Sequence, residues 1–132
     1  MIEENKLITN SDKKGYMIQA VLHNWRNLEY ASERLKNDAD FVYSATNNWK
    51  ALRFVSDRLK NNTKFYTIAV KKNWKALRYA SERLKNNKQL VREAVNQNWK
   101  ALRYASERLK NDSLFCTELK KQILEERWGG RQ

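Results

Sequence analysis

Four segments of this chain each carry a basic residue, an aromatic residue four positions later, and an arginine four positions after that. These triads are Arg26, Tyr30 and Arg34; Lys50, Phe54 and Arg58; Lys75, Tyr79 and Arg83; and Lys100, Tyr104 and Arg108. Residues four apart lie on one side of an α-helix. Stacked helices would align the triads, so that rings could stack on nucleic-acid bases while cations contact phosphates. The same surface would suit an acidic or phosphorylated protein.

The triads also have an interpretation in which they only pack. The aromatic ring can lie against the neighbouring repeat, with the aliphatic stems of Lys and Arg across its face. Phe54 has no polar tip, which favours packing. The sequence leaves both interpretations open, and the exposure of Tyr79 and Tyr104 would separate them.

The triads belong to a repeat that is marked by tryptophan. Trp25, Trp49, Trp74 and Trp99 are 24, 25 and 25 residues apart, and the segment NWKALRYASERLKN occurs unchanged at 73–86 and 98–111. A fixed period of this size is typical of stacked supersecondary units. We therefore predict an all-α fold, a short solenoid-like array of helical hairpins with a repeat of about 25 residues. We expect the tryptophans themselves to be packing anchors at helix starts.

The predicted array forms one domain over residues 1–132. It has an N-terminal cap at 1–24, repeats at 25–48, 49–73 and 74–98, and a last repeat at 99–132. The last repeat ends in a longer capping helix, because the segment DSLFCTELKKQILEERW places Phe115, Leu119 and Ile123 four residues apart. Repeat arrays need atypical ends that cover their apolar faces.

Each repeat should contain two helices, as the third repeat illustrates. The first is predicted to run from Trp74 to Lys85, with Asn73 as its N-cap and Asn86 as a left-handed C-cap. Asn87 is then placed to cap the second helix.

Two further stripes follow from this first helix. One is a core stripe at i, i+3 and i+7. Its members are Leu28, Ala31 and Leu35; Leu52, Val55 and Leu59; Leu77, Ala80 and Leu84; and Leu102, Ala105 and Leu109. The other is a solvated row of ion pairs four residues apart, Arg53 with Asp57, Arg78 with Glu82 and Arg103 with Glu107.

The repeat motif resembles a known family. The segment ALRYASERLKND, with a following F or L and an AV before the next N-W pair, is similar to a bacterial family of short helical repeats, domain of unknown function 4116. The resemblance covers roughly residues 16–115 and departs at the RNLEY segment of the first repeat and at both ends. It implies an α-helical scaffold without an assigned enzymatic activity, and it supplies no catalytic residues.

The charge indicates an anionic partner. The chain has 27 Lys and Arg against 15 Asp and Glu, a net charge of +12, which favours nucleic acid, an acidic protein or an anionic membrane surface. An Asn- and Lys-rich compositional bias would explain part of this charge. The repeat at 25–48 has a net charge of −1, whereas 49–73 and 74–98 carry +6 and +4. The candidate partner-binding residues are Lys50, Phe54, Arg58, Lys71, Lys72, Lys75, Tyr79, Arg83, Lys100, Tyr104 and Arg108.

Catalytic chemistry is not expected. His23 is the one histidine and Cys116 the one cysteine, so no metal-ligand set or intrachain disulfide can be built from them. We predict no catalytic, cofactor-binding or metal residues. The absence of a disulfide, a secretory signal and a long apolar segment favours a cytoplasmic protein without a membrane span.

Three functions remain as hypotheses. The first is a non-enzymatic binding scaffold for an acidic protein or a nucleoprotein complex, with a role as effector or inhibitor as its speculative extension. The second is direct binding of RNA or single-stranded DNA along the triads. The third is a structural spacer within a larger assembly.

Overall fold

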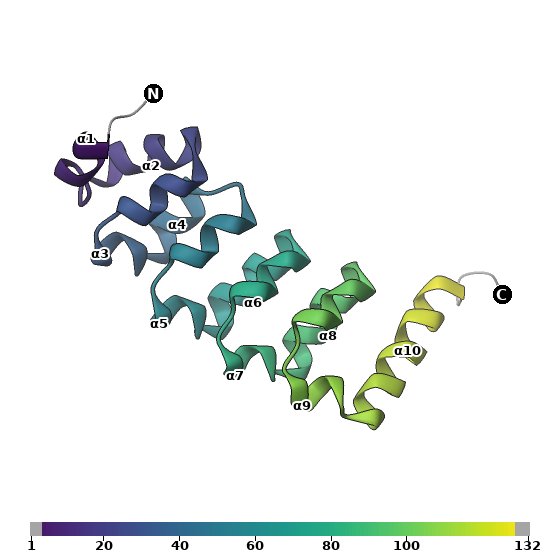
Figure 1. The fold of residues 1–132 in the computed structure, drawn as a ribbon. Helices are drawn as coiled ribbons and strands as arrows, with labels where there is room; N and C mark the ends of the chain where they lie inside the picture. Colours follow the sequence, from purple (N-terminus) through teal and green to yellow (C-terminus); the bar gives the residue numbers. More distant parts are fainter. Residues whose placement is uncertain (1–3, 129–132) are drawn as a thin grey trace. The chain divides into compact units, whose positions relative to one another are not determined.

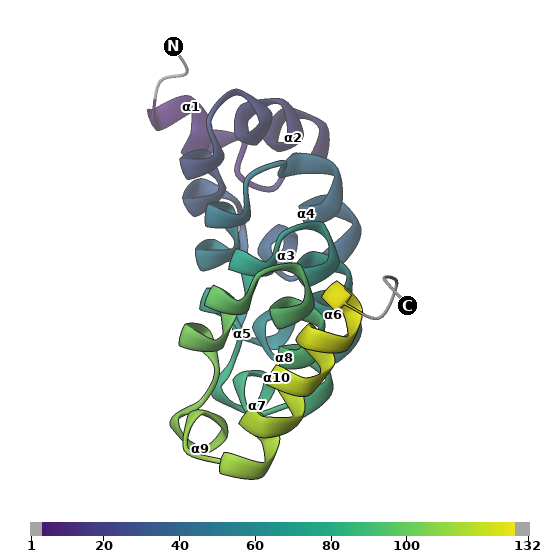
Figure 2. The same ribbon diagram turned by 90° about the vertical axis from the view of Figure 1, so that its right-hand side faces the viewer.

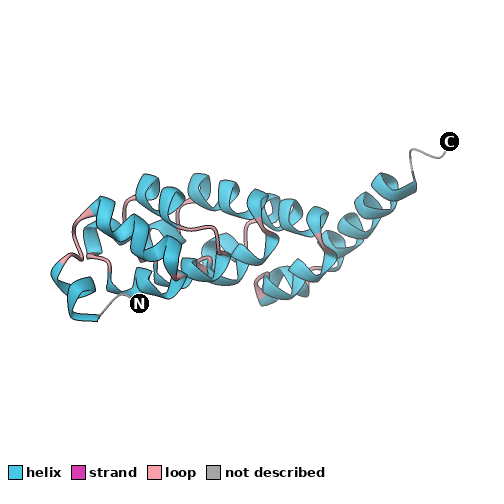
Figure 3. Ribbon diagram, turned by 90° about the horizontal axis from the view of Figure 1, so that it is seen from above, coloured by secondary structure: helices cyan, strands magenta, loops and turns pink. Residues whose placement is uncertain are grey.

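The computed structural model describes residues 4–128, and for residues 126–128 only the backbone. These residues form helices joined by turns, without a strand (Figure 3). Their contacts divide the chain into two compact units, residues 1–65 and 66–132, which are described separately below. The fold class predicted from the repeat is therefore confirmed: this is an all-α repeat array with a longer C-terminal helix.

Unit 1 contains the N-terminal segments and the first repeats. Its helices are α1 (Glu4–Thr9), α2 (Lys14–His23), the 3₁₀ helix η1 (Trp25–Tyr30), α3 (Glu33–Lys36), α4 (Ala39–Ala45), the 3₁₀ helix η2 (Trp49–Phe54) and α5 (Asp57–Lys60). The boundary between the units falls inside α6 (Thr63–Lys72). Within unit 1, η1 packs against η2 and α2 packs against α4, so like elements of successive repeats are neighbours.

Unit 2 repeats the same arrangement. After α6 come η3 (Trp74–Tyr79), α7 (Glu82–Lys85), α8 (Lys88–Gln97), η4 (Trp99–Tyr104), α9 (Glu107–Lys110) and α10 (Ser113–Trp128). Figures 1 and 2 show α8 and α10 side by side, each entered from a short helix, α7 or α9. In this unit η3 packs against η4.

The prediction that one helix runs from each Trp to the Lys of RLK is wrong. In the last repeat η4 ends at Tyr104, and Ala105 is extended (φ −69°, ψ 162°). A separate α-helix of four residues, α9, then begins behind Ser106. The Ser106 hydroxyl accepts a hydrogen bond from the backbone N–H of Leu109 at 3.2 Å, so serine is the N-cap of the second segment. Each repeat therefore has three helical segments instead of two.

The helix caps predicted for the asparagines of the repeat are partly confirmed. The Asn before each Trp accepts a hydrogen bond from the second backbone N–H beyond it, as Asn98 does from Lys100 at 2.9 Å. Asn87 likewise caps α8 by accepting from the backbone N–H of Leu90 at 3.1 Å. The left-handed C-cap is wrong, because Asn86 has φ −96°. No non-glycine residue of the described chain has positive φ.

The core stripe is correct although its helix is not continuous. Leu77, Ala80 and Leu84 are all buried, and the matching residues of the other repeats are buried too, with one exception. Leu102 in the last repeat is only half-buried. Phe115 and Leu119 of α10 are buried, as the four-residue spacing predicted, and Ile123 is half-buried.

Candidate functional site

Two of the triad rings, Phe54 and Tyr104, lie against a tryptophan of the preceding repeat. In unit 2 the Tyr104 ring lies against Trp74, with centroids 6.1 Å apart and planes inclined at 30°. In unit 1 the Phe54 ring lies 6.1 Å from Trp25 at the same angle. These contacts favour packing for Phe54 and Tyr104, and they leave each ring only half-buried.

An arginine covers each of these rings, and it is not the arginine of the triad. The guanidinium of Arg103 lies 5.8 Å from the Tyr104 ring centroid, that of Arg78 lies 5.6 Å from Tyr79, and that of Arg53 lies 5.0 Å from Phe54. A guanidinium within about 6 Å of a ring makes a cation–π contact. The ring and the arginine directly before it are therefore presented together at the surface. The sequence signal was the R-Y or R-F pair that recurs in three repeats.

The triads themselves do not form one side of a helix. Lys100 and Tyr104 belong to η4, whereas Arg108 belongs to α9 beyond the extended residues. The break separates Arg26 and Tyr30 from Arg34, Lys50 and Phe54 from Arg58, and Lys75 and Tyr79 from Arg83 in the same way. The alignment expected from a spacing of four thus fails, because the helix that would create it ends between the aromatic residue and the arginine.

The basic candidates differ in their surroundings. Most are exposed, namely Lys50, Arg58, Lys71, Lys72, Arg83, Lys100 and Arg108. Lys75 is half-buried, with its ammonium 5.6 Å from the centroid of the Trp74 ring. Lys71 and Lys72 lie in the last turn of α6, where cations are favoured by the helix dipole.

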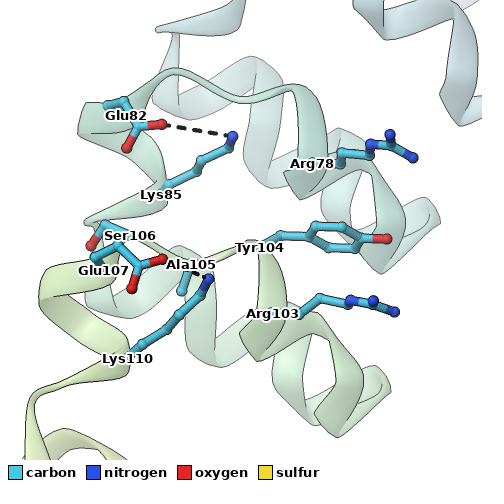
Figure 4. Close-up of a pocket in the computed structure, with 9 residues that line it drawn as sticks. All are labelled: Arg78, Glu82, Lys85, Arg103, Tyr104, Ala105, Ser106, Glu107 and Lys110. Atoms are coloured by element: carbon cyan, nitrogen blue, oxygen red, sulfur yellow. Dashed lines mark hydrogen bonds and ion pairs between the residues drawn. The ribbon is translucent and has the colours of Figure 1, made fainter.

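A groove in unit 2 brings the arginine and tyrosine side chains together. It has a volume of about 670 Å³ and is lined by Arg78, Glu82, Lys85, Arg103, Tyr104, Ala105, Ser106, Glu107 and Lys110. In Figure 4 the side chains of Arg78, Tyr104 and Arg103 extend in the same direction, with the ring between the two guanidinium groups. This arrangement presents two cations, and each lies over its own ring, Arg78 over Tyr79 and Arg103 over Tyr104.

The lysines of this groove are compensated and the arginines are not. Lys85 pairs with Glu82 at 3.8 Å, and Lys110 pairs with Glu107 at 3.2 Å. The expected pairs of Arg78 with Glu82 and of Arg103 with Glu107 do not form in the described residues, because the break in the helix places each acid beside the lysine three residues later. Two positive charges thus remain in the groove, on the exposed Arg78 and Arg103.

Within each unit a serine connects one repeat to the repeat before it, a contact that the spacing of the sequence did not predict. The Ser106 hydroxyl donates to Asn86 Oδ1 at 2.8 Å, and its backbone N–H donates to the Lys85 carbonyl at 2.9 Å. In unit 1 Ser56 makes the same contacts with Asn37 and Lys36. Asn37 and Asn86, which follow the RLK segments, thus contact the next repeat, and this contact explains their presence without a left-handed conformation.

In the N-terminal segment before the first repeat, a carboxylate accepts the corresponding hydrogen bond from serine. Asp12 takes the place of the asparagine: it accepts from the Ser32 hydroxyl at 2.6 Å and from Arg34 Nε at 2.9 Å. These two hydrogen bonds, the one from Ser32 first, lower the pKa of Asp12. Arg34 is therefore tied to the cap. No ion pair forms to the equivalent Arg58 or Arg108 among the described residues.

Two aspartates at helix starts also have a lowered pKa. The pKa of Asp112 is lowered, first by the hydrogen bond from the Phe115 backbone N–H and then by the charge of Lys88 at 3.7 Å. The pKa of Asp38 is lowered by the backbone N–H of Phe41 and, less, by Lys14. Both carboxylates serve as helix caps.

Trp25 and Trp74 behave as packing anchors, whereas Trp99 does not. Trp25 and Trp74 are half-buried against the next repeat's ring, but Trp99 is 64% exposed. The expectation that all four tryptophans are packing anchors is thus wrong for Trp99.

Residues 4–125, for which side chains are described, contain no group of three or more His, Cys, Asp and Glu placed to hold a metal ion. Cys116 is half-buried, and its Sγ lies 3.6 Å from the carbonyl oxygens of Leu109 and Lys110. No helix of the described chain is both long and apolar enough to cross a membrane.

The repeat places the chain in a family. The model of the family described as domain of unknown function (DUF4116) matches three overlapping segments, residues 14–60, 46–85 and 62–110. The chain belongs to this family. The segments together cover more than half of the chain, and they overlap as expected for a repeat. No curated protein and no solved structure matches the chain.

Proposed function

We propose that this chain is a non-enzymatic basic scaffold that binds an acidic protein, or a nucleoprotein complex with acidic surface. The observation that carries the proposal is the groove in which Arg78 and Arg103 flank Tyr104 without acidic partners (Figure 4). A planar guanidinium pairs bidentately with carboxylate, and one already stacked on a ring loses less conformational freedom when it does so.

The packing of the rings favours a protein over single-stranded nucleic acid. Base stacking needs an accessible ring face. The Tyr104 ring contacts Trp74 and Arg103, and the Phe54 ring contacts Trp25 and Arg53. Cations remain as the groups offered to a partner. Direct binding of RNA or single-stranded DNA is the alternative, and it requires these rings to exchange an intramolecular contact for a base.

Capture from lysate tests the proposal. The chain is immobilised and exposed to a lysate that has been treated with nuclease, and retained proteins are identified by mass spectrometry. The wild-type chain should retain an acidic protein that the double variant Arg78→Glu, Arg103→Glu does not retain.

The matched control is Lys6→Glu with Lys64→Glu, which changes the net charge equally at exposed residues outside the groove. It should retain the same protein as the wild type. A protein that is retained from untreated lysate but not from nuclease-treated lysate would instead support nucleic-acid binding. Equal retention by all three chains would contradict the role of Arg78 and Arg103, and retention by none of them would favour the spacer.

A further inference from the structure

The C-terminal end of the array carries an exposed apolar surface centred on Trp99. Three adjoining hollows share this side chain, and the largely apolar one has a volume of about 390 Å³. We call this hollow of about 390 Å³ the end groove. It is lined by Val95, Trp99, Leu102, Cys116, Leu119, Lys120, Ile123 and Leu124.

The repeat itself shows what such a surface contacts. The Trp25 ring is covered by Phe54, and the Trp74 ring by Tyr104, in each case from the next repeat. Trp99 holds the corresponding position in η4 but is 64% exposed. Leu102 is half-buried, whereas its equivalents Leu28 and Leu77 are 0% exposed. The end groove therefore has the shape and chemistry of a site for an aromatic ring.

The charge around the groove selects the partner. The ionisable side chains that line the three hollows, apart from the thiol of Cys116, are Lys100, Arg103, Lys110 and Lys120, all basic. Of these, Lys110 is paired with Glu107. Lys100 and Lys120 are exposed. A second copy of this chain would bring another basic rim against the first, so a homodimer through this surface is opposed by like charges.

We propose that the end groove binds an amphipathic segment of another protein, with an aromatic side chain placed on Trp99 and carboxylates facing Lys100 and Lys120. The aromatic side chain takes the position that Tyr104 takes on Trp74. Leu124, which is 55% exposed, and Ile123 then contact an aliphatic residue one or two helical turns further along the segment. This site goes beyond the arginine groove of the proposed function and does not depend on it.

The test uses a synthetic acidic peptide as the probe. Phe and two Leu occupy positions i, i+3 and i+7 of the peptide, with Glu at the remaining positions. Two comparison peptides replace Phe by Ala or every Glu by Lys. Binding is followed by isothermal titration and by the indole N–H signals of the ¹⁵N-labelled protein, where Trp99→Phe assigns the signal of interest.

The acidic peptide should shift the Trp99 indole signal, and both comparison peptides should bind at least tenfold more weakly. Trp99→Ala and Lys120→Glu should each weaken binding of the acidic peptide by a similar factor. Leu114→Ala is the matched control. Leu114 is 68% exposed, lies on α10 as Lys120 does, and does not line the groove. It should bind as the wild type does.

Three results would overturn the proposal. They are absence of binding by the acidic peptide, equal binding by the Ala peptide, and Trp99-dependent self-association of the protein in sedimentation experiments. Because Trp99 is exposed, its substitution should leave the far-UV circular dichroism unchanged, and that measurement separates loss of binding from loss of fold. Arg78 lines the arginine groove and none of the three hollows at Trp99, so a failure of Arg78→Glu to change capture does not affect this result.

Discussion

At the scale of a single residue, the Ser106 side chain makes hydrogen bonds to two different elements. Its oxygen caps α9 by accepting from Leu109, and its hydroxyl proton goes to Asn86 of the preceding repeat. The same serine recurs in each repeat, as Ser32, Ser56 and Ser81. Hydrogen bonds of this residue therefore set both the start of a helix and the spacing between repeats.

Replacing this serine should destabilise the fold. Ser106→Ala is expected to lower the free energy of unfolding by about 2 kcal/mol, since an N-cap and a further hydrogen bond each contribute about 1 kcal/mol. Urea unfolding followed by circular dichroism measures the change. Ser113→Ala, at an exposed position of the same unit, should stay within about 0.5 kcal/mol of the wild type. Equal effects of the two substitutions would refute the double role of Ser106.

Asp112 gives a prediction for the dependence of stability on pH. Its folded-state pKa lies below the ordinary value of 3.8, because the carboxylate accepts from Phe115 and faces Lys88. A lowered folded pKa means that the carboxylate contributes stability above the unfolded pKa and loses it as pH falls through the folded pKa.

The comparison with Asp112→Asn isolates this contribution, because Asn62 and Asn87 show that asparagine caps the equivalent helix. The wild type should be the more stable of the two near neutral pH. Its advantage should shrink as the pH is lowered below 3.8. Urea unfolding at a series of pH values measures the difference, and a constant difference down to about pH 3 would show that the carboxylate charge contributes nothing.

At the scale of elements, the sequence predicted much of the fold. The tryptophan period, the buried Leu77 and Leu84, and the caps by Asn87 and Asp112 follow from local pattern. The break within the first helix could not be predicted in this way. The break coincides with hydrogen bonds from Ser106 to the preceding repeat, which no local spacing reveals.

The expected alignment of the triads failed for the same reason. A spacing of four aligns Lys100, Tyr104 and Arg108 only in a continuous helix. Once the helix is divided, the cation at the ring is Arg103, which stands directly before it. The contacts of Phe54 with Trp25 and of Tyr104 with Trp74 favour the packing interpretation for these two aromatic residues.

Chemical shifts test the division of the helix directly. The ¹³Cα secondary shifts should be helical from residues 99 to 104, should become extended at Ala105 and Ser106, and should return to helical values from Glu107 to Lys110. The identical segment at Asn73–Asn86 provides an internal replicate, with the break at Ala80 and Ser81. An unbroken helical run over either segment would contradict the account.

At the scale of the whole molecule, the chain carries a net charge of +12. Its Phe54 and Tyr104 rings pack against tryptophans of the preceding repeats. Charge alone would attract any polyanion, with an affinity that falls as salt is raised. The feature that goes beyond net charge is the placement of arginine on a ring, with the neighbouring lysines compensated by glutamates. We therefore propose that particular cations bind the partner, and not the charge as a whole.

The most direct measurement compares two pairs of arginines in the same two repeats. Arg78→Gln with Arg103→Gln removes the cations of the groove, whereas Arg83→Gln with Arg108→Gln removes the arginines that a continuous helix would have aligned. Both double variants lose the same charge, and poly-L-glutamate serves as the acidic probe in isothermal titration. The account predicts that the first pair weakens binding about tenfold, or roughly 1.4 kcal/mol, and that the second weakens it by less than about threefold. Equal losses for the two pairs would contradict it, because binding would then follow net charge alone.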